Sequence, residues 1–110
     1  MNKLVKGLAA AGVAAAMSQG AVAACGDVTI AEMNWASAEF MANVDKIILE
    51  EGYGCTVELV PGATLTTCAS MDTKGVPDIA PELWTQSVEK PLKAAIESGS
   101  LHSMNPMPIL

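Results

Sequence analysis

The stretch VTIAEMNWASAEFMANVDKIILEEGYGCTVELV, residues 28–60, decides the fold. Residues 28–35 are rich in β-branched and large apolar side chains, which predicts a strand. Residues 55–60 alternate and end at Pro61 and Gly62, which predicts a second strand followed by a turn. The segment between them has helical periodicity, so the stretch predicts a β-α-β unit.

The helix between these strands is predicted from the spacing of its apolar residues. The positions expected to share one face are Phe40, Met41, Val44, Ile47 and Ile48. Ser37 is placed to cap the amino end, and Gly52 and Gly54 supply a stop at the carboxyl end.

Beyond residue 62 the pattern predicts a helix, a short strand and another helix. The second helix starts at Thr64, and its expected inward positions are Leu65, Cys68, Ala69 and Met71. Gly75 and Pro77 close it. The third strand spans residues 76–83, but Pro77 and Pro81 shorten it to little more than residues 78–80.

The third helix is expected to be capped by Ser87 and to run through Glu97, with Gly99 as its stop. Its expected apolar face consists of Val88, Leu92, Ala95 and Ile96. The element order β-α-β-α-β-α predicts an α/β fold with a parallel sheet, right-handed crossovers and helices on its faces.

Residues 1–23 have the pattern of a cleavable signal peptide. Lys3 and Lys6 precede an apolar run at residues 8–17, and Ala21-Val22-Ala23 supplies the small residues that signal peptidase requires. We therefore expect cleavage after Ala23, a periplasmic location and no membrane insertion of the remaining chain. A retained membrane anchor is one alternative. Lipid attachment at Cys25 is another, because residues 22–25 loosely match a lipoprotein box.

The chain that follows the leader is acidic. It holds four lysines, no arginine and twelve acids, a net charge of about −8. Without a basic cluster it lacks the positively charged surface needed to bind nucleic acid or anionic lipid. About 87 residues make one small domain, residues 24–110, which buries only about 60–65% of its unfolded surface. A covalent link would therefore add useful stability.

Two of the three cysteines mark the amino ends of predicted parallel strands. Cys25 precedes the first strand and Cys55 opens the second, so in an oxidising compartment we expect a disulfide between them. It closes a loop of about 30 residues, worth roughly 3–4 kcal/mol in the chain-entropy model; two buried free thiols are the alternative. Cys68 is interpreted as a small buried hydrophobe, since a nucleophile needs a histidine and only His102 is present.

Trp35 ends the first predicted strand and Trp84 follows the third, so both lie at the carboxyl edge of the sheet. Ligands of open α/β sheets bind at that edge. Indole faces attract cations and, grouped in cages, hold quaternary ammonium groups. Acids near these strand ends add negative potential: Glu32, Glu39 and Glu82. Filling the core is the alternative role for each tryptophan.

Three segments resemble the substrate-binding proteins of glycine betaine and proline-type ABC importers: VTIAEMNW at 28–35, IILEEGYGC at 47–55 and PDIAPELW at 77–84. The likeness covers Cys25 to about Pro106. It implies a type II periplasmic-binding-protein fold, in which two α/β lobes close on the ligand, and a first lobe whose Trp35 and Trp84 belong to an aromatic cage around a trimethylammonium group.

The same resemblance makes Asn34 and Glu82 flanking candidates in the ligand site, and implies a small quaternary ammonium osmolyte and an ABC permease as partners. It implies neither a cofactor nor chemistry on the ligand. Family members are much longer, so residues 24–110 are expected to be the N-terminal part of a lobe, truncated relative to the family.

Two other functions remain open from the sequence. One is a truncated product without activity. The other is a periplasmic soft-metal carrier in which His102, Met104 and Met107 would bind Cu(I). The sequence contains no credible pair of nucleophile and base, so we do not expect an enzyme of hydrolase type.

Overall fold

The computed structural model describes residues 25–104. These residues form two strands, three α-helices and two short helical turns. In chain order the elements are β1 (Gly26–Met33), α2 (Ala36–Ile47), the π-helical turn η1 (Ile48–Gly52), β2 (Cys55–Gly62), α3 (Thr64–Lys74), the 3-10 turn η2 (Thr85–Val88) and α4 (Glu89–Ser98). The predicted α/β class is confirmed.

β1 and β2 form a parallel pair joined by α2, as the β-α-β pattern predicts. The register runs from Gly26 opposite Cys55 to Met33 opposite Gly62. β1 begins two residues earlier than expected and ends at Met33, and the predicted turn at Pro61 and Gly62 is wrong because β2 continues through both. A proline fits there because β2 is an edge strand, where a missing donor costs least.

The predicted third strand is reduced to a single parallel bridge between Ile30 and Ile79. The amide N–H of Ala31 donates to the carbonyl oxygen of Ile79 at 2.8 Å, and that of Ile79 donates to Thr29 O at 3.1 Å. Pro77 and Pro81 flank this point and have no N–H to donate, so the ladder does not extend. β1 therefore lies between β2 and the segment around Ile79.

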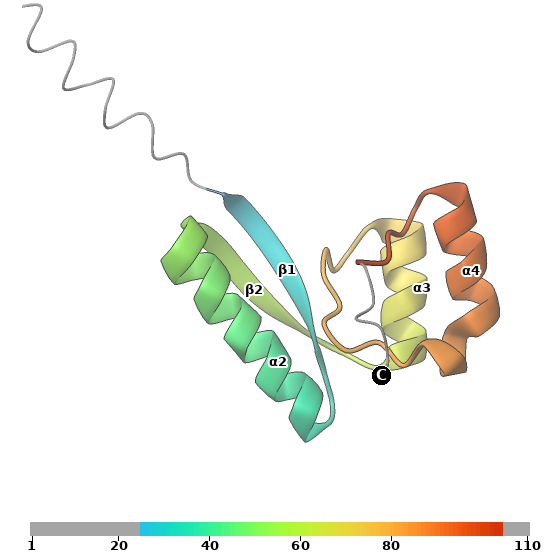
Figure 1. Ribbon diagram of the computed structural model, residues 1–110, viewed down its shortest axis with the longest axis horizontal. Helices are drawn as coiled ribbons and strands as arrows, with labels where there is room; N and C mark the ends of the chain where they lie inside the picture. The colour runs from blue at the N-terminus through green and yellow to red at the C-terminus, as the bar shows by residue number, and fades with distance from the viewer. Residues whose placement is uncertain (1–24, 105–110) are drawn as a thin grey trace, which may run out of the picture.

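The two strands separate the helices into two groups (Figure 1). α2 packs on β1 and β2, where a buried cluster forms from Ile30, Ala42, Cys55 and Val57. In the view of Figure 1, α3 and α4 stand next to each other on the opposite side of the strands. The strands thus form the central layer.

The expectation for the buried face of α2 is wrong. Phe40 and Ile47 are 70% and 60% exposed, whereas Ala38 and Ala42 are buried completely. Alanines four residues apart lie on the same side of a helix and let its backbone approach the strands closely. The larger apolar side chains consequently point away from the sheet.

The expected caps of α2 and α4 are also wrong. Trp35, in extended conformation, is the residue at the amino end of α2, and no side chain caps that end. Ser87 lies inside η2, so α4 begins two residues later at Glu89. Both serines are free for other contacts.

The inward face of α3 is narrower than predicted. Thr67 and Cys68 are buried, whereas Leu65 and Ala69 are exposed. In α4, Val88 just before the helix and Ala95 are buried, Leu92 is half-buried and Ile96 is 39% exposed. α3 and α4 pack on each other and on η2, so only a narrow strip of each helix is covered.

The expected stops of α3 and α4 are confirmed. α3 ends at Gly75 with φ of 69°, and α4 ends at Gly99 with φ of 84°. A side chain is disfavoured at such left-handed positions, and glycine adopts them without steric cost.

The amino ends of the two strands are joined covalently. The predicted disulfide between Cys25 and Cys55 is present, with the two Cα atoms 4.4 Å apart. Cys55 is buried beneath α2, so the bridge is continuous with the core cluster.

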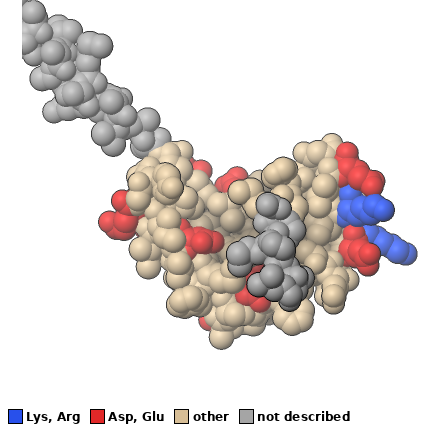
Figure 2. All heavy atoms as spheres, in the orientation of Figure 1, with Lys and Arg blue, Asp and Glu red and all other residues tan. Residues whose placement is uncertain are grey.

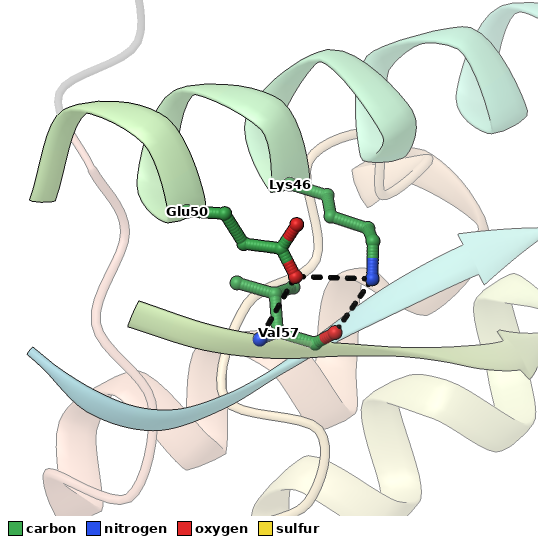
Figure 3. A network of polar contacts seen from close by, with 3 residues as sticks. All are labelled: Lys46, Glu50 and Val57. Atoms are coloured by element: carbon green, nitrogen blue, oxygen red, sulfur yellow. Dashed lines mark hydrogen bonds and ion pairs between the residues drawn. The ribbon is translucent and has the colours of Figure 1, made fainter. Parts of the chain in front are cut away.

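Two side chains, one from α2 and one from η1, form hydrogen bonds with the main chain of β2 (Figure 3). Lys46 Nζ donates to the carbonyl oxygen of Val57 at 2.8 Å, and the Val57 N–H donates to Glu50 Oε1 at 3.4 Å. Lys46 and Glu50 form an ion pair at 3.2 Å. Two side chains therefore satisfy the main-chain groups that Val57 does not share with β1.

Between residues 25 and 104, no helix is both long and apolar enough to cross a membrane. The predicted signal peptide, its cleavage after Ala23 and the residues preceding Cys25 in the lipoprotein box lie outside the described residues.

Candidate functional site

The carboxyl end of the sheet brings the two tryptophans together. β1 ends at Met33, and Trp35 follows two residues later, whereas Trp84 follows the Ile79 bridge. The ring centroids are 6.2 Å apart with an angle of 77° between the planes, an edge-to-face arrangement. Residues separated by 49 positions in the sequence thus form one aromatic pair.

A single carboxylate oxygen connects both indoles. Glu82 Oε1 accepts hydrogen bonds from Trp35 Nε1 at 2.9 Å and from Trp84 Nε1 at 3.2 Å. It accepts a third from Ser37 Oγ at 3.1 Å. Ser37, predicted as a helix cap, contributes to this site instead.

The hydrogen bonds also set the protonation state of Glu82. Donation from Trp35 is the main reason that the pKa of this carboxyl lies below its usual value, helped by Ser37 and Trp84 and opposed by partial desolvation. Glu82 is therefore ionised at neutral pH.

Packing on the strands fixes one indole more firmly than the other. Trp35 packs with Leu83 on a buried cluster that includes Met33 and Ala38. Trp84 is 60% exposed. One ring is thus anchored in the structure, whereas the other is held chiefly at its N–H.

An open hollow of about 370 Å³ is lined by Trp35, Thr64, Trp84 and Ser87. Its size falls within the range of small-molecule sites. A larger hollow of about 650 Å³ lies along η2 and α4 and contains no aromatic side chain. The smaller one matches the predicted ligand chemistry better, because only its walls include indoles.

Gly62 allows α3 to approach this end of the sheet. A Cβ atom at this position would overlap Thr67 Oγ1, whose hydroxyl contacts Met33 Sδ at 3.6 Å. Thr64, at the start of α3, consequently reaches the hollow. Sequence reasoning missed Thr64 and Ser87, because neither residue type nor spacing distinguishes them from ordinary helix-start residues.

Asp78 fixes the segment that carries Glu82 and Trp84. Its Oδ2 accepts from the Thr29 amide at 2.8 Å and from Thr29 Oγ1 at 2.7 Å. The Asp78 N–H donates back to Thr29 Oγ1 at 2.9 Å. Chiefly because of the Thr29 amide, the pKa of Asp78 lies below its usual value.

The other predicted acids and Asn34 lie outside this network. Asn34 is exposed beside Trp35. Glu32 Oε2 accepts from Asn43 Nδ2 at 2.9 Å, and Glu39 is exposed in the first turn of α2. Of the expected site residues, the structure thus brings together Trp35, Trp84 and Glu82.

Within the described residues, the fold supports neither a Cys68 nucleophile nor a soft-metal site at His102 and Met104. Cys68 is buried, and its pKa is raised by burial and then by Asp72, so the thiolate is disfavoured. His102 and Met104 are exposed, and Met107 lies outside the described residues. No group of three His, Cys, Asp or Glu side chains within residues 25–104 is arranged to hold a metal ion.

Residues 26–108 match the family model described as the substrate binding domain of the ABC-type glycine betaine transport system. The chain belongs to this family. A search of curated proteins found no match. The resemblance drawn from residues 28–35, 47–55 and 77–84 is therefore confirmed, as is the expected type II binding-protein fold class. Glycine betaine substrate-binding domains are extracytoplasmic and bind a solute without transforming it.

Charge is unevenly spread over this binding domain (Figure 2). In the face shown, acidic side chains are scattered, while the basic ones lie at the edge occupied by α4, which contains Lys90 and Lys93. Among residues 25–104, no lysine forms an ion pair with Glu82.

Proposed function

We propose that this chain is the extracytoplasmic solute-binding component of an ABC importer for quaternary ammonium osmolytes such as glycine betaine or choline. The observation that carries the proposal is the edge-to-face pair of Trp35 and Trp84 around the ionised Glu82. An ammonium group bearing methyls donates no strong hydrogen bond, so aromatic faces and a nearby negative charge are the features that recognise it.

The solute binds in the hollow that both indoles line together with Thr64 and Ser87, with its methyl groups against exposed indole surface. Trp35 supplies the fixed wall, because its ring packs on the core, and Trp84 supplies the exposed wall. Asn34 and Glu82 flank the pair as polar residues. Residues 24–110 form part of the first lobe of the two-lobed clamp, and an ABC permease receives the solute.

Export precedes binding in this proposal. Residues 1–23 direct the chain across the cytoplasmic membrane and are removed after Ala23, and the domain works in the periplasm. The disulfide between Cys25 and Cys55 supports this location, because such bonds persist in oxidising compartments. It also favours a cleavable signal over lipid attachment, which would use the Cys25 thiol.

The proposal is tested by removing each indole in turn. We expect Trp35→Ala and Trp84→Ala each to weaken choline binding by about 3- to 30-fold, the range that a cation–π contact contributes. Ligand-observed NMR of the N-methyl signal is the suitable measurement, since it does not depend on tryptophan emission and detects weak binding.

Tyr53→Ala provides the matched control, because Tyr53 is an exposed aromatic at the other end of the domain. It should leave binding unchanged. Equal affinity in the wild-type chain and both tryptophan variants would contradict the proposed site. Affinity of this chain should be orders of magnitude below that of a two-lobed clamp, because one face of the solute remains in water.

A further inference from the structure

Glu82 is a carboxylate without a cationic partner. The ion pair of Lys46 with Glu50 is the only one formed among residues 25–104, and it lies at the carboxyl end of α2, whereas Trp35 precedes the amino end. Glu82 is instead surrounded by three neutral donors. Its negative charge is therefore stabilised by dipoles but not neutralised.

The two oxygens of Glu82 have different surroundings. Oε1 accepts all three hydrogen bonds, whereas Oε2 is buried and has no hydrogen-bond partner among the described residues. Buried acceptors without partners are uncommon and costly. The donors of Trp35, Trp84 and Ser37 thus all converge on one oxygen of the carboxylate.

Both indoles donate to the same oxygen, and this fixes their relative orientation. A ring can rotate about its side-chain bonds, but an N–H held at 2.9 or 3.2 Å from one oxygen removes most of that freedom. Trp84 depends on this contact more than Trp35, because its ring is largely exposed. The edge-to-face geometry thus follows from a shared acceptor.

Donation to a carboxylate also changes the indole rings. Hydrogen bonds in a chain polarise one another, and an N–H that donates to an anion shifts electron density toward the ring. The faces of Trp35 and Trp84 consequently attract a cation more strongly than indoles whose N–H groups face water. A neutral solute of the same shape gains nothing from this polarisation.

We propose that Glu82 is the positioning and specificity-determining residue of the site: it orients both indoles through Oε1, and its uncompensated charge selects a quaternary ammonium group over a neutral group of equal shape. This inference rests on the proposed function for its ligand class. The positioning part stands on geometry alone. Glu82 acts through the indoles and does not itself contact the solute.

Two substitutions separate the two roles. Glu82→Gln keeps an amide oxygen that can accept from both indoles but removes the charge. Glu82→Ala removes the acceptor as well. Glu51→Gln is the matched control, because Glu51 is an exposed acid of η1, at the opposite end of α2 from Trp35, and its loss changes net charge equally. Far-UV circular dichroism confirms that each variant is folded.

The ligand probes are choline and 3,3-dimethylbutan-1-ol, which replaces the ammonium nitrogen with carbon. In the wild-type chain choline should bind more tightly than the alcohol. In Glu82→Gln the ratio of the two affinities should fall on the order of tenfold, the effect of removing one nearby charge at an effective dielectric between protein and water. The alcohol should bind as before, and Glu51→Gln should keep the wild-type ratio.

The indole N–H resonances test positioning without any ligand. With only two tryptophans, the ¹H–¹⁵N spectrum contains two indole signals. Glu82→Ala should move both, whereas Glu82→Gln should leave both near their bonded positions. Unmoved signals in Glu82→Ala, or an equal loss of choline and alcohol binding in Glu82→Gln, would overturn the inference.

Failure of the proposed function has a different signature. If the wild-type chain shows no preference for choline while Glu82→Ala still moves both indole signals, the assigned ligand and the selecting role of Glu82 are wrong and its positioning role holds. If choline is preferred and the signals do not move, the function stands and the role of Glu82 is refuted.

Discussion

The two ends of the β1–β2 pair are built differently. At the amino end, a disulfide joins Cys25 to Cys55, and a half-exposed ion pair holds the backbone at Val57. At the carboxyl end, Trp35 and Trp84 meet only through hydrogen bonds to Glu82 and an edge-to-face contact. One end is fixed by a covalent bond and core packing, whereas the other packs one indole on the core and leaves the second largely open to solvent.

The difference shows that the two ends of the eight-residue strands have different roles: the amino end stabilises the domain, and the carboxyl end carries the aromatic pair. Elements that bind ligands are generally drawn from the less stable parts of a fold, because surface kept for a ligand contributes nothing to the core. A covalent bond at the opposite end compensates a small domain for that loss. We therefore expect substitutions at the two ends to affect separable properties.

The largest effect should come from removing the disulfide. Replacing Cys25 and Cys55 by serine should lower the free energy of unfolding by roughly 3–4 kcal/mol, because the unfolded chain regains the freedom of a loop of about 30 residues. Urea denaturation at neutral pH measures this. A reductant should lower the stability of the wild-type chain but not of the double variant.

The independence of the two ends is tested in the same samples. Under native conditions, the two indole N–H resonances of the double serine variant should keep their wild-type positions. A large shift in both would mean that the amino end also shapes the tryptophan pair, and the two ends would then have to be treated as one unit.

A smaller effect is expected at Asp78, which fixes the segment leading to Glu82. Asp78→Ala should lower the free energy of unfolding by about 1 kcal/mol at pH 7, because two hydrogen bonds at an exposed site are lost. It should also broaden the Trp84 indole signal, since the segment that carries this ring is no longer held to Thr29.

The contribution of Asp78 depends on pH in a defined direction. Its folded pKa lies below the ordinary 3.8, so the stabilisation is fully present above that value and is lost as the pH falls through the folded pKa. The neutral variant Asp78→Asn should flatten this loss. If the difference in stability between wild type and Asp78→Asn is the same at pH 7 and at pH 2, the carboxylate is not the stabilising form.

The smallest effect is expected for Lys46 and Glu50. A double-mutant cycle should give a coupling free energy of about 0.5 kcal/mol, because half-exposed ion pairs are screened by solvent. The coupling should fall as salt is added. Lys93 and Glu97 in α4 have the same residue types and spacing but form no ion pair among the described residues, so their cycle should give a value near zero.

Sequence patterns predicted the amino end better than the carboxyl end. The strands and the disulfide follow from alternation, β-branched side chains and the placement of Cys25 and Cys55, all of which are local signals. The buried face of α2 was predicted wrongly, because large apolar residues such as Phe40 and Ile47 recur on one side of the helix and were expected to face the sheet. The helix nevertheless packs through Ala38 and Ala42, whose small size matters only once the sheet is present.

At the carboxyl end, the sequence indicated the two tryptophans but not how they are joined. Ser37 was predicted to cap a helix, yet it donates to Glu82, 45 residues away. Such a contact depends on where the bridge at Ile79 places the following residues. Two prolines shorten that strand, and no periodic pattern encodes its continuation.

The contact of Lys46 and Glu50 with Val57 has a consequence for the behaviour of many copies of the protein together. A strand at the edge of a sheet can recruit an extended segment of another molecule, which is a common route to aggregation. Here the outward N–H and C=O of Val57 are already engaged, and Pro61 offers no N–H at all. An incoming strand cannot form a continuous ladder along β2, which disfavours pairing of this edge with a second copy.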